Sequence, residues 1–193
     1  MKRTPYGLGM AYICVCALAI GTRAMGVEPR FVRAEHEPSA APVATTGAAW
    51  FGIVKPYCNS VEVETTLNGH PAPGGIDGVG YQAGCLALAG KIDRARAVIA
   101  TLPEATRWQA AGIVFDLAHP VADAGDDASA GPIMAMVVDF WPNHPMALYH
   151  AGVAEAALGE SARARRHLTS FLNYYRQHDG WRANAHAVLK KLR

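Results

Sequence analysis

The sequence predicts an all-α fold, built as an array of stacked helix-turn-helix units, and three observations carry this prediction. A glycine followed five residues later by an alanine occurs three times, at Gly90/Ala95, Gly125/Ala130 and Gly159/Ala164, with the glycines 35 and then 34 residues apart. In the outer copies an Ala-rich apolar stretch precedes the glycine, and apolar residues at helical spacing follow it. An amphipathic segment at 181–192 comes after the third copy. A period of about 20 to 50 residues indicates stacked units that bury their apolar faces against their neighbours.

Residues 1–24 have the pattern of a secretory signal peptide. Lys2 and Arg3 precede an apolar run from Leu8 to Ile20, and a small-x-small cleavage pattern ends at Ala24. The apolar run is shorter than the roughly 20 residues that a membrane-spanning helix needs. We therefore expect an extracytoplasmic protein, periplasmic or secreted. An uncleaved segment that anchors the chain in a membrane is the alternative.

The charge of the exported chain argues against a nucleic-acid partner. Removing residues 1–24 takes three of the 18 Lys and Arg residues and none of the 16 Asp and Glu residues, which leaves 15 basic against 16 acidic side chains. No basic stripe then remains of the kind that contacts a phosphate backbone.

Two segments are expected between the signal and the array. Residues 25–48 are rich in Pro, Ala, Thr and charge, which is typical of a flexible linker. Residues 49–75 are predicted to form an N-terminal cap, and its first core residues are Trp50, Phe51, Ile53 and Val54. Asn59 and Glu62 have the spacing of a helix capping box, which favours a short helix as far as Gly69. A strand is the alternative, because Val61, Val63 and Thr65 alternate with acidic residues.

Three helix pairs are expected, within residues 76–110, 111–144 and 145–178. A glycine tolerates the left-handed backbone that ends a first helix, and the small alanine lets the second helix pack closely. The middle pair contains two prolines, which disrupt helix interiors. Pro120 is therefore expected to stop the first helix near His119, and Gly131-Pro132 to delay the second until Pro132. A wide, exposed turn over 123–129 would then join them.

From about Ile76 to His178 the chain resembles the tetratricopeptide repeat family. The residues that carry the resemblance lie mostly in the last unit: Leu148, Ala151, Gly152, Gly159, Ala164, Leu168 and Phe171, with Pro142 ending the unit before it. Two residues depart from the family pattern, Glu155 where a large aromatic is usual and Arg176 where proline is usual. The resemblance implies a right-handed α-solenoid in which segment 181–192 is the capping helix.

The resemblance also implies where a ligand would bind. Tetratricopeptide repeats present ligand-facing side chains on the exposed side of each first helix, and in the last unit these positions are Met146, Tyr149 and Val153. Their spacing of three and four residues places them on one helix face. The implied partner is a protein or peptide. The alternative is that the terminal helix folds back and buries these side chains.

Two cysteines, Cys58 and Cys85, remain once the signal is removed. An even number of cysteines in an exported protein favours a disulfide, which would attach the cap to the first repeat helix and stabilise the fold by about 2 to 4 kcal/mol. Two buried thiols are the alternative.

Catalytic and metal-binding motifs are not evident in the sequence. The eight histidines do not show the zinc-ligand pattern of a helical i, i+4 pair with an acid between, and Asp123, Asp126 and Asp127 lack the calcium-loop pattern. We therefore expect no cofactor, no metal and no enzymatic activity.

The sequence thus predicts a non-enzymatic exported scaffold, as a monomer or a homodimer. One alternative is a membrane-anchored accessory subunit of a cell-envelope complex. Another is a thiol-dependent enzyme that uses Cys58 or Cys85 with His70.

Overall fold

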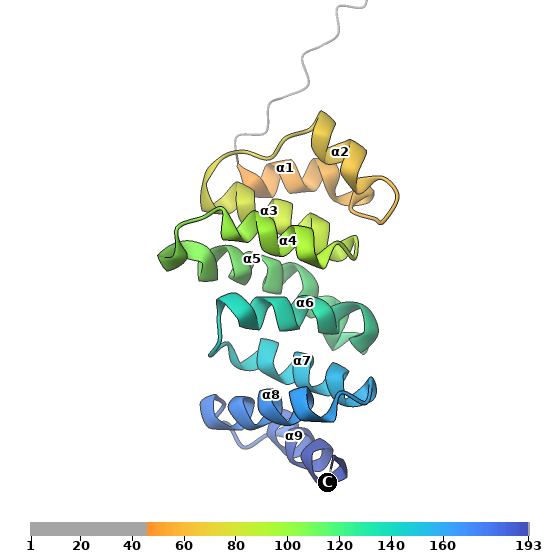
Figure 1. Cartoon of the computed structure of the whole chain (residues 1–193), viewed down its shortest axis with the longest axis vertical. Helices are drawn as coiled ribbons and strands as arrows, with labels where there is room; N and C mark the ends of the chain where they lie inside the picture. Colours follow the sequence, from red (N-terminus) through yellow and green to blue (C-terminus); the bar gives the residue numbers. More distant parts are fainter. Residues whose placement is uncertain (1–45, 193) are drawn as a thin grey trace, which may run out of the picture. The chain divides into compact units, whose positions relative to one another are not determined.

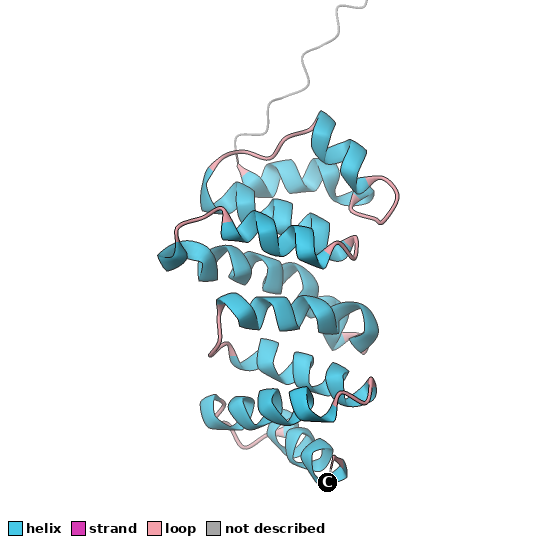
Figure 2. Cartoon of the chain, in the orientation of Figure 1, coloured by secondary structure: helices cyan, strands magenta, loops and turns pink. Residues whose placement is uncertain are grey.

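The computed structural model describes residues 46–192, and this part of the chain contains helices and no strands (Figure 2). The helices, in chain order, are α1 (Gly47–Val54), the short 3₁₀ helix η1 (Lys55–Tyr57), α2 (Val63–Gly69), α3 (Gly75–Leu88), α4 (Ile92–Ala100), α5 (Glu104–Asp123), α6 (Asp127–Phe140), α7 (Pro145–Ala157), α8 (Ser161–Tyr174) and α9 (Gly180–Lys191). The predicted signal peptide, and the predicted linker as far as residue 45, lie outside the described residues. None of the helices between residues 46 and 192 has the length and apolar character that crossing a membrane requires.

The first helix begins two residues inside the predicted linker. Thr46 caps α1, because its hydroxyl accepts a hydrogen bond from the N–H of Ala49 at 3.2 Å. Trp50, Phe51 and Val54 are buried as expected, and α1 packs against α3. The expectation for Ile53 is wrong, since this side chain lies on the opposite face of α1 and is exposed.

The cap continues through η1 into α2, which confirms the helix prediction and makes the strand alternative wrong. The Asn59 side-chain oxygen accepts hydrogen bonds from the backbone N–H groups of Val61 and Glu62, both at 3.0 Å. The Glu62 carboxylate accepts from the Asn59 side-chain amide at 2.7 Å, so only half of the capping-box pattern forms. Val63 and Leu67, four residues apart, provide the buried face of α2.

The three periodic glycines occupy the same position in three equivalent turns. Gly90, Gly125 and Gly159 have φ angles of 74°, 84° and 78°, in the left-handed region that favours glycine. After each one the next residue donates its N–H to a carbonyl five residues back, from Lys91 to Leu86, Asp126 to Val121 and Glu160 to Glu155. Each glycine N–H donates to the carbonyl three residues back. This is the Schellman ending of a helix, and it recurs at the ends of α3, α5 and α7.

The middle pair is as regular as the others, so the expected effects of its prolines are wrong. Helix α5 continues past Pro120 to Asp123, and Ala122 in this last turn is buried against the core. Apolar packing of that turn outweighs the one hydrogen bond that proline removes. Likewise α6 begins at Asp127 rather than Pro132, because the Asp126 carboxylate caps it by accepting from the N–H of Ser129 at 3.1 Å. The expected wide turn is therefore a short one.

Gly131 has a packing role rather than a turn role. A Cβ atom added at this position would lie only 2.3 Å from the Cβ of Ala154 on α7. The missing side chain lets α6 approach α7 closely, and Ala130 beside it is fully buried. The alanine that follows each turn glycine behaves in the same way, since Ala95 and Ala164 are fully buried too.

The helices follow one another in chain order from α1 and α2 to α9 (Figure 1). Each of α3 to α8 packs against the helix that follows it, and α3 also packs against α5. Helix α5 begins at Glu104, ahead of the expected start of the second unit at 111, because Pro103 ends the preceding segment and occupies the N-cap position. The buried side chains form a core that continues from α1 into α7.

Glu155 stands where the repeat family has an aromatic residue, and it is almost completely buried. Its carboxylate forms an ion pair with Arg163 at 3.0 Å and contacts the His167 Nδ1 atom at 2.7 Å. Both partners lie on α8. The acid is therefore compensated across the turn by two side chains of the next helix.

Candidate functional site

The predicted ligand-facing residues lie under the last helix. Tyr149 is only 5% exposed, and Met146 and Val153 are partly buried beside it. The Tyr149 ring lies 5.0 Å from the ring of Trp181 on α9, and its hydroxyl accepts a hydrogen bond from the Asn184 side chain. Assigning Tyr149 to a ligand surface is therefore wrong, and the alternative in which the last helix folds back describes the structure. The reason is that α9 packs on both α7 and α8, with Ala185 buried and Val188 and Leu189 partly buried at the contact.

Hydrogen bonds at its start hold α9 in this position. The Asp179 carboxylate accepts from the N–H groups of Trp181 at 3.1 Å and Arg182 at 3.3 Å, and the Tyr175 hydroxyl also donates to it. The Tyr175 hydrogen bond and these N–H groups lower the pKa of Asp179. The Arg182 guanidinium donates to the carbonyls of Leu172 and Tyr175, at the end of α8. The face of α7 that was expected to bind a ligand is thus closed.

At the other end of the array, Cys58 and Cys85 form a disulfide with Cα atoms 4.9 Å apart. Cys58 follows η1 and is partly buried, and Cys85 lies in the middle of α3 and is fully buried. The bond fastens the segment that contains α1, η1 and α2 to α3. Neither sulfur is then a free thiolate, which is the nucleophile that a thiol-dependent enzyme needs.

An open apolar pocket of about 740 Å³ lies between α1 and α2. Three of its lining side chains are large, apolar and exposed: Ile53, Tyr57 and Val61, with Tyr57 46% exposed and Val61 82% exposed. Glu62 is the acidic residue of the lining, and it is exposed. The sequence analysis missed this pocket because Ile53 was placed in the core and the cap was treated only as support.

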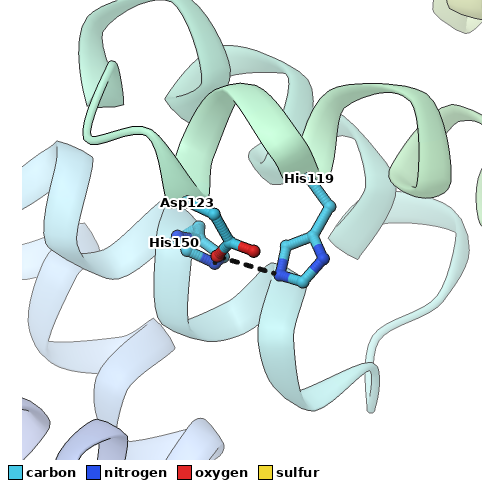
Figure 3. A group of neighbouring side chains, drawn as sticks. All are labelled: His119, Asp123 and His150. Atoms are coloured by element: carbon cyan, nitrogen blue, oxygen red, sulfur yellow. Dashed lines mark ion pairs between the residues drawn. The ribbon is translucent and has the colours of Figure 1, made fainter.

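A second group of side chains meets where the end of α5 lies beside α7 (Figure 3). His119 and Asp123 are one turn apart on α5, and His150 comes from α7. One Asp123 carboxylate oxygen lies 3.4 Å from the His119 Nε2 atom and 3.5 Å from the His150 Nε2 atom. One nitrogen of each histidine and one carboxylate oxygen all lie within 4.8 Å of one another.

The two imidazole rings lie in a largely apolar environment. His150 is 3% exposed, and burial, assisted by the neighbouring His119, lowers its pKa to about 4. The Phe115 ring stacks on His119 at 4.5 Å, and the Trp181 ring meets His150 edge-on at 5.7 Å. His150 is therefore a neutral imidazole at pH 7, with a lone pair on one nitrogen.

Sequence reasoning missed this cluster for a single reason. His119 and Asp123 have the i, i+4 spacing that places two side chains on one helix face, but Pro120 lies between them and was expected to end the helix. Because α5 continues through Pro120, the spacing holds in the structure.

Comparisons of the chain with protein family models, with curated proteins and with solved structures found no match. The functional conclusion therefore depends on this chain's own sequence and structure.

Proposed function

We propose that the protein is an exported, non-enzymatic helical-repeat scaffold that binds a protein or peptide partner through the pocket between α1 and α2. The observation that carries this proposal is the exposure of Ile53, Tyr57 and Val61 around one open pocket. Monomeric proteins seldom leave large apolar side chains exposed together without a binding role. The volume of the pocket is in the range that accepts side chains of a ligand.

The architecture in this proposal is a right-handed α-solenoid of tetratricopeptide-like repeats. Three helix pairs with the same glycine-centred turn support it, as do the buried alanines that follow these glycines. In the proposal α1, η1 and α2 cap the first repeat, and α9 caps the last. Stacked repeats need such end units because each repeat buries its apolar side only against neighbours.

The chemistry of the pocket defines the partner. Its lining combines exposed apolar side chains with Thr65, Thr66 and His70, and its acidic side chain, Glu62, is hydrogen bonded to Asn59 yet exposed to solvent. A peptide with one or two large apolar side chains beside a lysine or arginine would fill the pocket and place its positive charge near Glu62. We therefore propose an apolar peptide segment with an adjacent basic residue as the occupant.

Export supports the same proposal. The Cys58–Cys85 bond is of the kind that persists outside the cytoplasm, where thiols are not kept reduced. In this proposal residues 1–24 are the signal that directs the chain there, and the linker separates that signal from the helical part.

The test is a matched pair of substitutions at two half-exposed tyrosines. Tyr57 in the pocket is 46% exposed, and Tyr174 at the end of α8 is 53% exposed. Peptides that bind the wild-type protein would be selected from a random library, and their affinities measured by fluorescence anisotropy. We expect Tyr57→Arg to weaken binding by roughly tenfold or more, as for the central residues of an interface, and Tyr174→Arg to leave it unchanged.

Both variants should keep the wild-type free energy of unfolding to within about 0.5 kcal/mol, which is usual for surface positions. Selected peptides that bind Tyr57→Arg as tightly as the wild type would overturn the proposal. A dimer in sedimentation experiments that Tyr57→Arg alone dissociates would show instead that a second copy occupies the pocket.

A further inference from the structure

We infer that His119, Asp123 and His150 form a binding site for a divalent transition-metal ion of the Zn²⁺ type, held between α5 and α7. The donor set is two imidazole nitrogens and one carboxylate oxygen. Zn²⁺ and its neighbours in the first transition series accept this mixture, whereas Ca²⁺ and Mg²⁺ prefer oxygen ligands alone. This site is independent of the pocket between α1 and α2.

The distances suit a metal ion better than they suit hydrogen bonds. A carboxylate that accepts a hydrogen bond from an imidazole N–H lies about 2.7 to 3.2 Å from the nitrogen. Here the Asp123 oxygen lies 3.4 and 3.5 Å from the two Nε2 atoms (Figure 3). Ligands held about 2.0 to 2.1 Å from a tetrahedral Zn²⁺ ion are separated from one another by about 3.4 Å. Both nitrogen–oxygen distances therefore already have the tetrahedral value.

The third distance, between the two histidine nitrogens, is bounded by 4.8 Å. Any movement that brings the two nitrogens to the tetrahedral separation is therefore small. His119 can provide it, because its side chain lies at the surface of α5 and is partly exposed. His150 is held in place by the aromatic rings that pack against it.

The second line of support is that the nitrogens concerned lack other partners. The Nε2 atoms of His119 and His150 are both buried without a hydrogen-bond partner. Buried polar atoms are normally hydrogen bonded, since leaving one unpaired is unfavourable. A metal ion would accept the lone pairs of both nitrogens at once.

Binding at this site would connect the first helices of two successive pairs. Three protein ligands leave a fourth coordination position open, as in zinc sites that bind water or a further ligand. Asp123 is half-exposed, so this position is reached from the solvent side. The ion would also stabilise the folded chain, because its three ligands come together only when α5 and α7 are packed.

The experiment uses the full chain, purified without a histidine tag and freed of metal with a chelator. ZnCl₂ would be titrated in by isothermal calorimetry, and CoCl₂ by visible absorption, which reports tetrahedral coordination. We expect one ion per chain and a melting temperature that rises with Zn²⁺. His119→Gln and Asp123→Asn should each weaken Zn²⁺ binding by more than roughly tenfold, since even outer-shell partners of metal ligands contribute that much.

His178→Gln is the matched control, because His178 is exposed and lies outside the cluster. It should bind Zn²⁺ as the wild type does. The proposal fails if the wild type binds no ion, if His119→Gln binds as tightly as wild type, or if the control loses as much affinity as the cluster variants. The Co²⁺ spectrum and the Zn²⁺-dependent melting of the wild type decide the question even if a variant is unstable. None of these measurements involves the peptide pocket, so the two proposals fail separately.

Discussion

The two ends of the helical array are closed in different ways. At the N-terminal end a disulfide fastens the cap to α3, and the cap leaves a pocket with exposed apolar side chains. At the C-terminal end α9 is held by apolar packing and hydrogen bonds, and it covers the face of α7 that contains Tyr149. A helix face at the end of the chain of helices is therefore exposed or part of the core according to which segment follows it.

The covalent bond explains how the N-terminal end keeps apolar side chains exposed. Helix α9 is held without a covalent bond, and it buries Ala185 and partly buries Val188 and Leu189, while Trp181 stays 37% exposed. The Cys58–Cys85 bond provides stabilisation that needs no further burial, and α2 buries only Val63 and Leu67. Ile53 and Tyr57 thus remain exposed in a stable structure.

The largest expected effect comes from a charge at the closed end. Tyr149→Arg would remove a buried ring and place a cation between the rings of Phe171 and Trp181. Loss of a large buried aromatic alone costs about 3 to 5 kcal/mol, and the buried charge adds to this. We expect the free energy of unfolding in urea to fall by at least that amount.

Tyr174→Arg is the control for this prediction, because it introduces the same residue at an exposed tyrosine near the end of α8. A Tyr149→Arg protein as stable as Tyr174→Arg would show that α9 does not cover α7 in solution. The two ends of the array would then be equally open.

The second prediction concerns the disulfide end. Cys58 and Cys85 are 27 residues apart, and closing a loop of that length corresponds to about 3.5 kcal/mol in the chain-entropy account. Replacing both by alanine should lower the free energy of unfolding by about 2 to 4 kcal/mol, and a reductant should destabilise the wild type but not the double variant. Non-reducing peptide mapping gives the direct check. Two freely alkylated cysteines in the native exported protein would mean that packing alone holds both ends.

Much of the helical part was predictable because local chemistry and packing agree there. Gly90, Gly125 and Gly159 follow helix ends as expected, and the expected short helix α2 forms, although it begins at Val63 and Asn59 is not its N-cap. The errors arose where local and tertiary preferences differ. Pro120 disfavours a helix locally, yet the apolar packing of the next turn is stronger. A sequence pattern alone does not show whether the cost of a proline inside a helix is larger or smaller than the gain from packing the next turn.

The functional residues were less predictable than the helices, since they depend on contacts between distant segments. The burial of Tyr149 follows from the position of α9, which is fixed by side chains such as Asp179 and Arg182. The cluster of His119, Asp123 and His150 requires both an unbroken α5 and the packing of α7 beside it. Neither condition can be deduced from the spacing of residues along a single helix.

The smallest expected effect is a pH dependence at the start of α9. The hydrogen bond from Tyr175 and those from backbone N–H groups lower the pKa of Asp179 in the folded protein. A lowered folded-state pKa stabilises the fold fully above the unfolded-state value of about 3.9, and this contribution is lost as the pH falls through the folded-state pKa.

Asp179→Asn keeps a good N-cap without the charge. We therefore expect the variant to be less stable than wild type at pH 7 by a small amount that shrinks towards pH 3, measured by urea unfolding followed by tryptophan fluorescence. Asp126 titrates in both proteins and cancels in the difference. A difference that is the same at both pH values would show that the charge of Asp179 does not hold α9 closed.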